Sequence, residues 1–166
     1  MQACREALAQ VDIALSGAKF ATAWRGEGRS IFDLTKDRGF SEKQLEWRKR
    51  GRNQRYTVLH EQGELTKKGA RETLSKLHGR TNMAIVTSSQ KKHFDIIHGR
   101  TDLLPFFNFC LTREDYKRSK PDAEPYLLAL QRSGQSARHA LVIEDSPRGL
   151  TAAKAAGLTC WVIPGR

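Results

Sequence analysis

The pattern of apolar and polar positions changes near residue 82 of the chain. Before that point, apolar residues recur at about the helical period over residues 2–15, and Ser41 followed by Glu42 is typical of a helix start. A further helix is predicted over residues 66–77, because Gly79 provides a stop signal. The first half of the chain is therefore predicted to be mostly helical.

After residue 82, short apolar runs alternate with helical segments. The predicted strands span residues 82–87, 107–111, 139–143 and 158–163, and the predicted helices span residues 91–98, 123–132 and 146–157. This alternation is typical of a doubly wound parallel sheet. We predict an α/β protein with an N-terminal helical domain at residues 1–79 and a Rossmann-like core at residues 80–166. Since no covering helix follows the last strand, we expect the core to be incomplete at its C-terminal end, the alternative being an edge strand that needs no further cover.

The chain of 166 residues carries a formal net charge of +11, which favours a polyanionic partner or a phosphorylated substrate. Glutamates are interspersed with the densest run of basic residues, which contains Arg48, Lys49, Arg50, Arg52 and Arg55. Stacking aromatics of the RNA-binding kind are not interleaved there, so we interpret the run as a solvated helix face. We do not expect a nucleic acid to be the partner.

Cysteine usage and hydropathy limit the class of protein further. Cys4, Cys110 and Cys160 are widely separated and form no metal-binding spacing, so neither a disulfide framework nor a zinc site is indicated. The apolar runs are too short to cross a bilayer, and no signal segment opens the chain. We expect a cytoplasmic protein without a membrane partner.

Polar residues with possible chemical roles stand at the predicted strand ends and just before a helix. Thr87 ends the strand predicted at residues 82–87 and Ser88 follows it. A hydroxyl and backbone N–H groups could cradle a phosphoryl group there, although helix-capping residues are common at such a position. Lys120 precedes a proline that fixes its backbone, and it could place a positive charge on a phosphate or be an ordinary surface lysine. Glu144 and Asp145 follow a third strand, where adjacent carboxylates suit Mg²⁺ or cap the next helix. Together, these residues supply three of the four parts that aspartate-based phosphoryl transfer requires.

Three segments resemble the second, third and fourth motifs of the haloacid-dehalogenase-like superfamily: MAIVTSS, RSKPDAEPYLLAL and LVIEDSPRGLTAAKAAGL. The resemblance is to its β-phosphoglucomutase-like and phosphoglycolate-phosphatase-like branch, and residues 1–79 resemble the helical cap of that branch. It implies a hydrolase in which Thr87 and Lys120 act on the transferring phosphoryl group and Glu144 with Asp145 holds Mg²⁺. It also implies that Arg29 and Ser30 reach the substrate from the cap.

The first motif of that superfamily, an apolar strand that ends in Asp-x-Asp, does not occur in the sequence. Asp33 in Ile31-Phe32-Asp33-Leu34-Thr35 imitates its start, but it follows a Gly-Arg-Ser turn instead of an apolar strand. We therefore expect the motif to precede Met1. In this fold, the strand that bears it lies between the strands that end at Thr87 and Glu144, so we expect a sheet that lacks its first, central strand.

Three functions agree with these residues. The first is a Mg²⁺-dependent phosphatase or phosphomutase that acts on a small phosphorylated metabolite and is inactive as given because the nucleophile is missing. The second is a non-catalytic relative that binds phosphate and Mg²⁺, and the third is a basic nucleic-acid binder. A response-regulator receiver domain has similar groups, but in that domain the acidic pair comes first in the chain. In this sequence Glu144 and Asp145 come after Thr87 and Lys120, so the order along the chain excludes a receiver domain.

Overall fold

The computed structural model describes residues 6, 9, 16–20, 39–62 and 65–163. The chain forms two compact units, residues 1–63 and residues 64–166. The predicted helix at residues 2–15 lies outside the described residues except at Glu6 and Ala9, which are helical.

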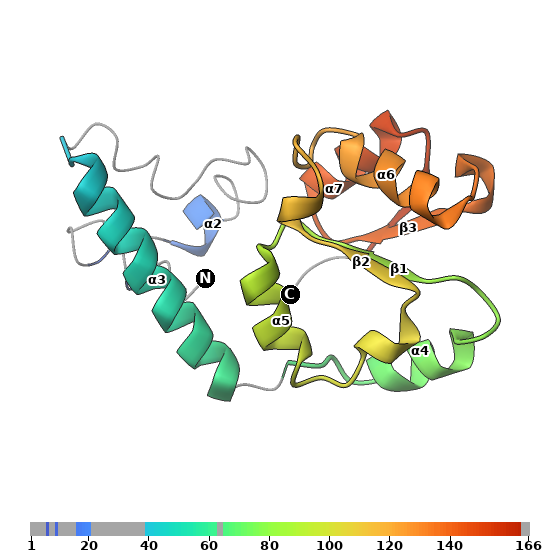
Figure 1. Ribbon diagram of the computed structural model, residues 1–166, viewed down its shortest axis with the longest axis horizontal. Coiled ribbons are helices and arrows are strands. Elements are labelled where there is room, and N and C mark those ends of the chain that lie inside the picture. Colours follow the sequence, from blue (N-terminus) through green and yellow to red (C-terminus); the bar gives the residue numbers. More distant parts are fainter. Residues whose placement is uncertain (1–5, 7–8, 10–15, 21–38, 63–64, 164–166) are drawn as a thin grey trace. The chain divides into compact units, whose positions relative to one another are not determined.

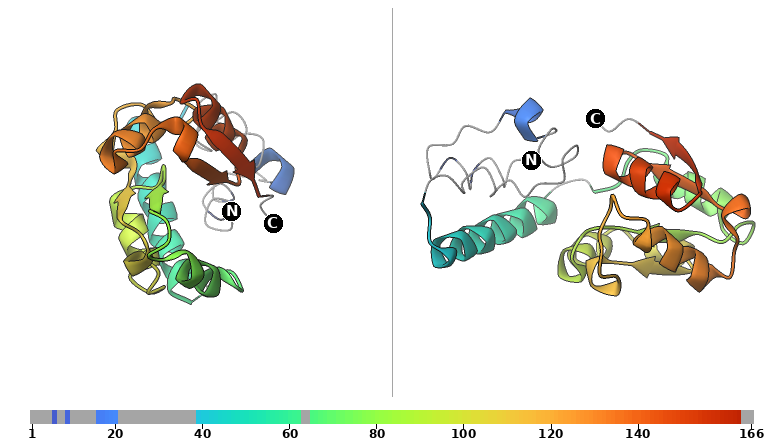
Figure 2. Two further views of the ribbon diagram at one scale, coloured as in Figure 1. Left: turned by 90° about the vertical axis from the view of Figure 1, so that its right-hand side faces the viewer. Right: turned by 90° about the horizontal axis from the view of Figure 1, so that it is seen from above.

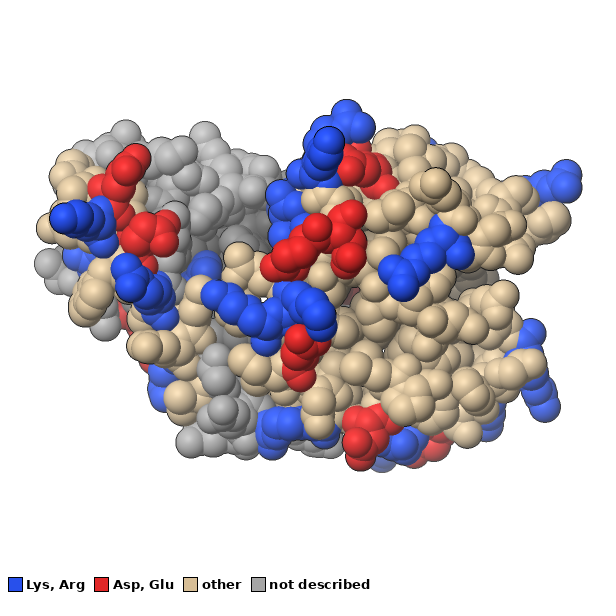
Figure 3. Space-filling model, viewed as in Figure 1, with Lys and Arg blue, Asp and Glu red and all other residues tan. Residues whose placement is uncertain are grey.

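The first unit contains α2 (Gly17–Phe20) and the long helix α3 (Glu42–Gln62). A reciprocal capping arrangement starts α3, because the Ser41 N–H donates to Gln44 Oε1 at 2.9 Å and the Gln44 N–H donates to Ser41 Oγ at 3.4 Å. The basic run lies on this helix, where Arg55 pairs with Glu6 at 2.6 Å. On the face shown in Figure 3, acidic and basic side chains of the described residues are interspersed.

The second unit is an α/β structure, as predicted. Its helices are α4 (Ala70–Leu77), α5 (Lys91–His98), α6 (Glu124–Ser133) and α7 (Pro147–Ala155), and its strands are β1 (Ala84–Val86), β2 (Phe109–Leu111), β3 (Leu141–Glu144) and β4 (Thr159–Val162). The short 3-10 turns η3 (Leu104–Phe106), η4 (Arg113–Asp115) and η5 (Ala137–His139) precede or follow strands. Figure 1 shows helices and strands alternating along this part of the chain.

The four described strands form two separate parallel pairs. β1 pairs with β2, with Val86 opposite Leu111, and β3 pairs with β4, with Glu144 opposite Val162. Within the described part of the chain, no ladder joins β1 to β3 (Figures 1 and 2). Among the described residues, one edge of β1 and one edge of β3 therefore carry no strand partner, as expected for a sheet that lacks its central strand.

A helical layer joins the two strand pairs. Ala152 and Ala153 on one face of α7 and the C-cap residue Ala156 are buried, and they form a core with Tyr126 of α6 and Leu158. Val86 of β1 and Val142 of β3 pack against this same core. The small alanine side chains let the helix approach both strand pairs closely. This layer therefore sets the position of β1 relative to β3.

The opposite face of the β3–β4 pair is apolar and uncovered within the described residues. Ile143 and Trp161, which are register partners, are 60% and 63% exposed, and Leu141 is 45% exposed. The side chains alternate along β3, so Val142 faces the helical layer while its neighbours face the other way.

α4 belongs to the second unit, whereas the sequence predicted it within the helical domain at residues 1–79. Its Arg71 donates from Nη2 to the carbonyl oxygen of Thr101 at 2.9 Å. The helix begins at Ala70, four residues later than predicted, because Gly69 adopts a φ of 81°, a left-handed conformation that favours glycine. Among the described residues, no helix is long and apolar enough to span a bilayer.

Candidate active site

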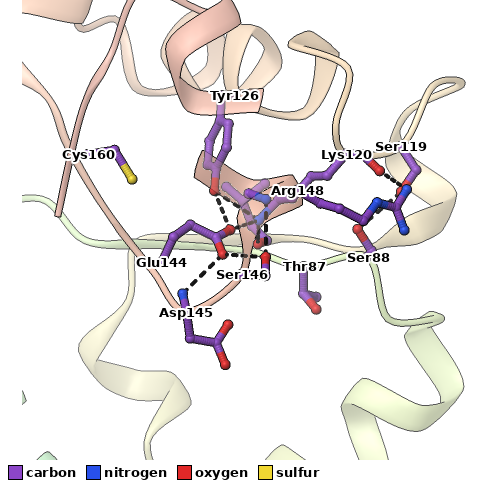
Figure 4. Close-up of polar contacts among 12 residues, drawn as sticks. Thr87, Ser88, Ser119, Lys120, Tyr126, Glu144, Asp145, Ser146, Arg148 and Cys160 are labelled. Carbon is purple, nitrogen blue, oxygen red and sulfur yellow. Dashed lines mark hydrogen bonds and ion pairs between the residues drawn. The ribbon is translucent and has the colours of Figure 1, made fainter. Parts of the chain in front are cut away.

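Lys120 places a buried ammonium group near the carboxyl ends of β1 and β3 (Figure 4). Its side chain is 10% exposed. The Nζ atom donates to the carbonyl oxygen of Val86 at 3.0 Å, to the hydroxyl of Tyr126 at 2.9 Å and to Oε1 of Glu144. A lysine ammonium has three N–H donors, so each donor has a partner in this arrangement.

Glu144, the last residue of β3, is the counter-charge of Lys120 and is equally buried, with 9% of its side chain exposed. Oε1 accepts from Lys120 and from the Tyr126 hydroxyl at 2.6 Å, and Oε2 accepts from Ser146 Oγ at 3.0 Å and from the Asp145 N–H at 3.2 Å. Burial alone would raise the pKa of Glu144, but hydrogen bonds from Lys120, Tyr126 and Ser146 lower it overall. The group is therefore an ionised carboxylate whose acceptor positions are all used.

Tyr126, in the first turn of α6, completes a buried triad with Lys120 and Glu144. The residue is 5% exposed, and its ring lies 4.6 Å from the Lys120 Nζ. Burial, and then the hydrogen bond to Glu144, raise the pKa of the phenol well above its ordinary value of 10.0. Because its oxygen accepts from Lys120, its one proton is directed to Glu144.

The turn between β3 and α7 has a sequence that brings Glu144 into place. Ser146 is the N-cap of α7 and accepts from the Gly149 N–H at 3.1 Å, and Pro147 occupies the first helical position. Gly149 gives the Glu144 carboxylate room, since a Cβ at this position would lie 1.9 Å from the Glu144 Cδ.

Two side chains hold the backbone on either side of Lys120. The carboxylate of Glu124 accepts from the N–H groups of Lys117 at 2.8 Å and Arg118 at 2.9 Å. The Nη2 atom of Arg148, on α7, donates to the carbonyl oxygen of Lys120. The loop is therefore tied to the helices that follow it and to the turn that carries Glu144.

Thr87 and Ser88 lie where the sequence placed them, directly after β1. The Thr87 N–H donates to the Leu111 carbonyl at 2.9 Å, and the Thr87 carbonyl accepts from the Tyr116 hydroxyl at 2.7 Å. Its Oγ1 accepts from the Ser89 N–H at 3.1 Å. The Ser119 hydroxyl donates to Ser88 Oγ at 3.1 Å, which joins this turn to the Lys120 loop.

Asp145 is exposed, and Figure 4 shows its carboxylate directed away from the Lys120, Tyr126 and Glu144 triad. Among the described residues, this carboxylate has no hydrogen-bond or ion-pair partner, so it could bind a cation. The Glu144 carboxylate differs, because a cation there would first have to replace one of the four protein groups that donate hydrogen bonds to it. Mg²⁺ prefers six oxygen ligands, and the described residues contain no group of three or more ligand side chains. Asp145 therefore fits a Mg²⁺ site, but further oxygen ligands are needed to complete it.

The structure brings together Thr87, Ser88, Lys120 and Glu144 of the predicted site, with Asp145 beside them. Arg29 and Ser30 lie outside the described residues. Sequence reasoning missed Tyr126 and Arg148. Tyr126 could have been noticed as a tyrosine on the buried face of a helix, because a buried phenol needs a polar partner.

The chain belongs to the haloacid dehalogenase-like hydrolase family, whose model matches residues 10–163. The predicted family is therefore confirmed. Over 97 residues, 58% of the chain, it is 33% identical to the validoxylamine A 7'-phosphate phosphatase of Streptomyces hygroscopicus subsp. limoneus, of which it covers 46%. Over 91 residues, 54% of the chain, it is 35% identical to a phosphorylated carbohydrates phosphatase of Thermotoga maritima, of which it covers 42%.

The fold is similar to that of a Lactobacillus plantarum protein assigned as a phosphoglycolate phosphatase, with a TM-score of 0.79 and 19% identity. That match covers 96% of this chain and 75% of the other. It shows a shared fold. The chain spans less than half the length of the two phosphatases it matches in sequence.

Proposed function

We propose that this chain is part of a Mg²⁺-dependent phosphatase that acts on a small phosphorylated metabolite. The observation that carries the proposal is the buried Lys120 ammonium, which lies near the carboxyl ends of two parallel strands. Ligands bind at this edge in open α/β sheets. The two phosphatases reported above act on phosphorylated compounds, which supports a phosphorylated substrate, and a phosphomutase would use the same groups.

The described residues have distinct roles in this proposal. Lys120 stabilises the charge on the phosphoryl oxygens, and Thr87 offers its hydroxyl and Ser88 its hydroxyl and N–H to the same oxygens. Asp145 holds Mg²⁺, and Glu144 holds Lys120 in place while its own acceptor positions are used by protein donors. When bound, Mg²⁺ supplies further positive charge beside the phosphoryl group. Arg29 and Ser30 contact the remainder of the substrate.

Catalysis in this proposal requires a strand between β1 and β3 that ends in an aspartate nucleophile. Neither strand has a partner on that side among the described residues, and a parallel strand there would use their unpaired backbone groups. The first aspartate of the Asp-x-Asp would attack phosphorus and displace the ester oxygen, which would take its proton from the second aspartate. Water would then hydrolyse the aspartyl phosphate and release inorganic phosphate.

The test compares the chain as given with a version that has an apolar strand ending in Asp-x-Asp joined upstream. Hydrolysis of p-nitrophenyl phosphate is measured with and without Mg²⁺. We expect turnover only from the extended chain, and a loss of about 100-fold or more when Lys120 is changed to Met. The absence of turnover from the extended chain, or turnover indifferent to Asp145→Ala, would contradict the proposal.

A second candidate function is phosphate and Mg²⁺ binding without chemistry. The sequence contains no Asp-x-Asp, yet the Lys120 site is formed within the described residues. This function predicts Mg²⁺-dependent binding of inorganic phosphate by the chain as given, measured by calorimetry. If phosphate binds and the extended chain shows no turnover, the second function is favoured over the first.

A further inference from the structure

The ammonium of Lys120 has one partner on each of three different elements. Val86 belongs to β1, Tyr126 to α6 and Glu144 to β3. Figure 4 shows the polar atoms of Tyr126 and Glu144 gathered around the Lys120 nitrogen. The ring of Tyr126 adds a cation–π contact, with its centroid 4.6 Å from Nζ. Because no N–H of the ammonium is without a partner, a phosphoryl oxygen can approach it only by replacing one of the three.

The three partners differ in what their replacement would cost. If a phosphoryl oxygen replaced Glu144 as a partner of Lys120, the buried Glu144 carboxylate would lose its counter-charge. If it replaced the Val86 carbonyl, a backbone acceptor of β1 would be left unpaired. If a phosphoryl oxygen replaced the Tyr126 hydroxyl as a partner of Lys120, the hydroxyl would still donate to Glu144 at 2.6 Å. The tyrosine hydroxyl is therefore the partner that can be replaced at the lowest cost.

We propose that Tyr126 is a positioning residue, whose hydroxyl holds the third N–H of Lys120 until a phosphoryl oxygen replaces it. This inference rests on the proposed function, since Lys120 is the group that meets the phosphoryl group. Tyr126 lies on α6, and none of the site residues predicted from the sequence lies on this helix. Without ligand, Tyr126 keeps the ammonium fully hydrogen-bonded in a buried position, and with ligand, the ammonium changes one partner.

The test follows hydrogen exchange of the Lys120 ammonium in the ¹⁵N spectrum of the full chain, with the signal assigned by Lys120→Arg. Tyr126→Phe removes the hydroxyl and keeps the ring. The matched control is Tyr116→Phe, because Tyr116 is also 5% exposed and its hydroxyl donates to the Thr87 carbonyl at 2.7 Å. Inorganic phosphate is the probe, and calorimetry measures its binding.

Without phosphate, we expect exchange in Tyr126→Phe to be faster than in the unmodified chain by about three- to tenfold, the range that one lost hydrogen bond allows. Tyr116→Phe should match the unmodified chain. With saturating phosphate, exchange in Tyr126→Phe and in the unmodified chain should become equally slow, because the phosphoryl oxygen now holds the third N–H. Phosphate should bind Tyr126→Phe at least as tightly as it binds the unmodified chain.

Equal exchange rates in Tyr126→Phe and the unmodified chain without phosphate would overturn the proposal. So would exchange in Tyr126→Phe that stays fast in saturating phosphate. If calorimetry detects no phosphate binding by the unmodified chain, the second candidate function is contradicted, and the ligand-free rates alone decide whether Tyr126 positions Lys120. If Tyr126→Phe does not fold, a nuclear Overhauser contact between the Lys120 ammonium and the Tyr126 ring in the unmodified chain decides it, and its absence overturns the proposal.

Discussion

The carboxylate of Glu144 occupies the space that a side chain at position 149 would fill. A Cβ on Gly149 would lie 1.9 Å from Cδ, 2.1 Å from Oε2 and 2.2 Å from Oε1 of Glu144. Gly149 is buried in the first turn of α7 and donates its N–H to the N-cap Ser146. The absence of a side chain at this position therefore lets the last residue of β3 reach Lys120 and Tyr126.

Gly149→Ala should displace the Glu144 carboxylate and weaken its bonds to Lys120 and Tyr126. We expect the free energy of unfolding of the second unit to fall by about 1–3 kcal/mol, the usual cost of overpacking a buried position. Urea unfolding, followed through the amide signals of β3, measures it. Gly51→Ala in α3 is the control, since a Cβ there meets nothing within 4 Å and alanine is the better helix former. Equal stability of Gly149→Ala and the unmodified chain would contradict the close approach.

Lys120→Met should destabilise the second unit strongly, because it leaves the Glu144 carboxylate buried without its counter-charge. The expected loss is about 3–5 kcal/mol, and Lys120→Met combined with Glu144→Gln should recover part of it. A double-mutant cycle in urea measures the coupling between the two side chains.

The surface pair Lys91–Asp95 is the comparison for that cycle, because its side chains are 65% and 52% exposed. Lys91→Met should change stability little, since exposed ion pairs are screened by water. Additive effects of Lys120→Met and Glu144→Gln would show that the buried pair is not coupled.

The stability of the second unit should depend on pH through Glu144. Its pKa in the folded chain is lowered from the ordinary 4.5, so its ionised form stabilises the fold fully above that value. The stabilisation should disappear as the pH falls below 4.5 and through the folded-state pKa. Urea unfolding between pH 3 and pH 7 should show the stability difference between the unmodified chain and Glu144→Gln shrinking at the acidic end. Parallel curves would contradict a lowered pKa.

Local patterns allowed most of the second unit to be predicted. The helix at residues 91–98 has the predicted bounds, and the four strands each lie within, or one residue beyond, a predicted range. Apolar periodicity and capping signals depend on neighbouring residues, so a sequence displays them directly. Strand ends are less certain because they depend on a partner strand, and here β1 and β3 each have a partner on one side among the described residues.

The site was predicted as single residues but not as a set of contacts. Lys120 and Glu144 are 24 positions apart, and their pairing depends on how α6 and α7 pack on the strands. The sequence suggested Glu144 as a metal ligand because it lies beside Asp145, whereas the structure shows its oxygens engaged by protein donors. Tyr126 resembles any core aromatic in the sequence, and its role becomes visible when Lys120 and Glu144 are placed around its hydroxyl.

The Ser146 hydroxyl caps α7 and also hydrogen-bonds to Glu144, so its removal should affect the helix start and the site. Its Oγ accepts from the Gly149 N–H at 3.1 Å and donates to Glu144 Oε2 at 3.0 Å. Ser146→Ala should lower stability by about 1 kcal/mol through the lost cap. Ser146→Asp keeps a cap acceptor but brings a second carboxylate to Glu144, so it should also be less stable than the unmodified chain, although aspartate is normally a good N-cap.

Ser136→Ala is the control, because Ser136 precedes η5 without a side-chain cap bond. Thermal unfolding of the three variants and the unmodified chain measures the effect at neutral pH and at pH 4. Acid should narrow the gap between Ser146→Asp and the unmodified chain, because protonation relieves the repulsion between the two carboxylates. A Ser146→Asp variant as stable as the unmodified chain at neutral pH would show that Ser146 does not act through Glu144.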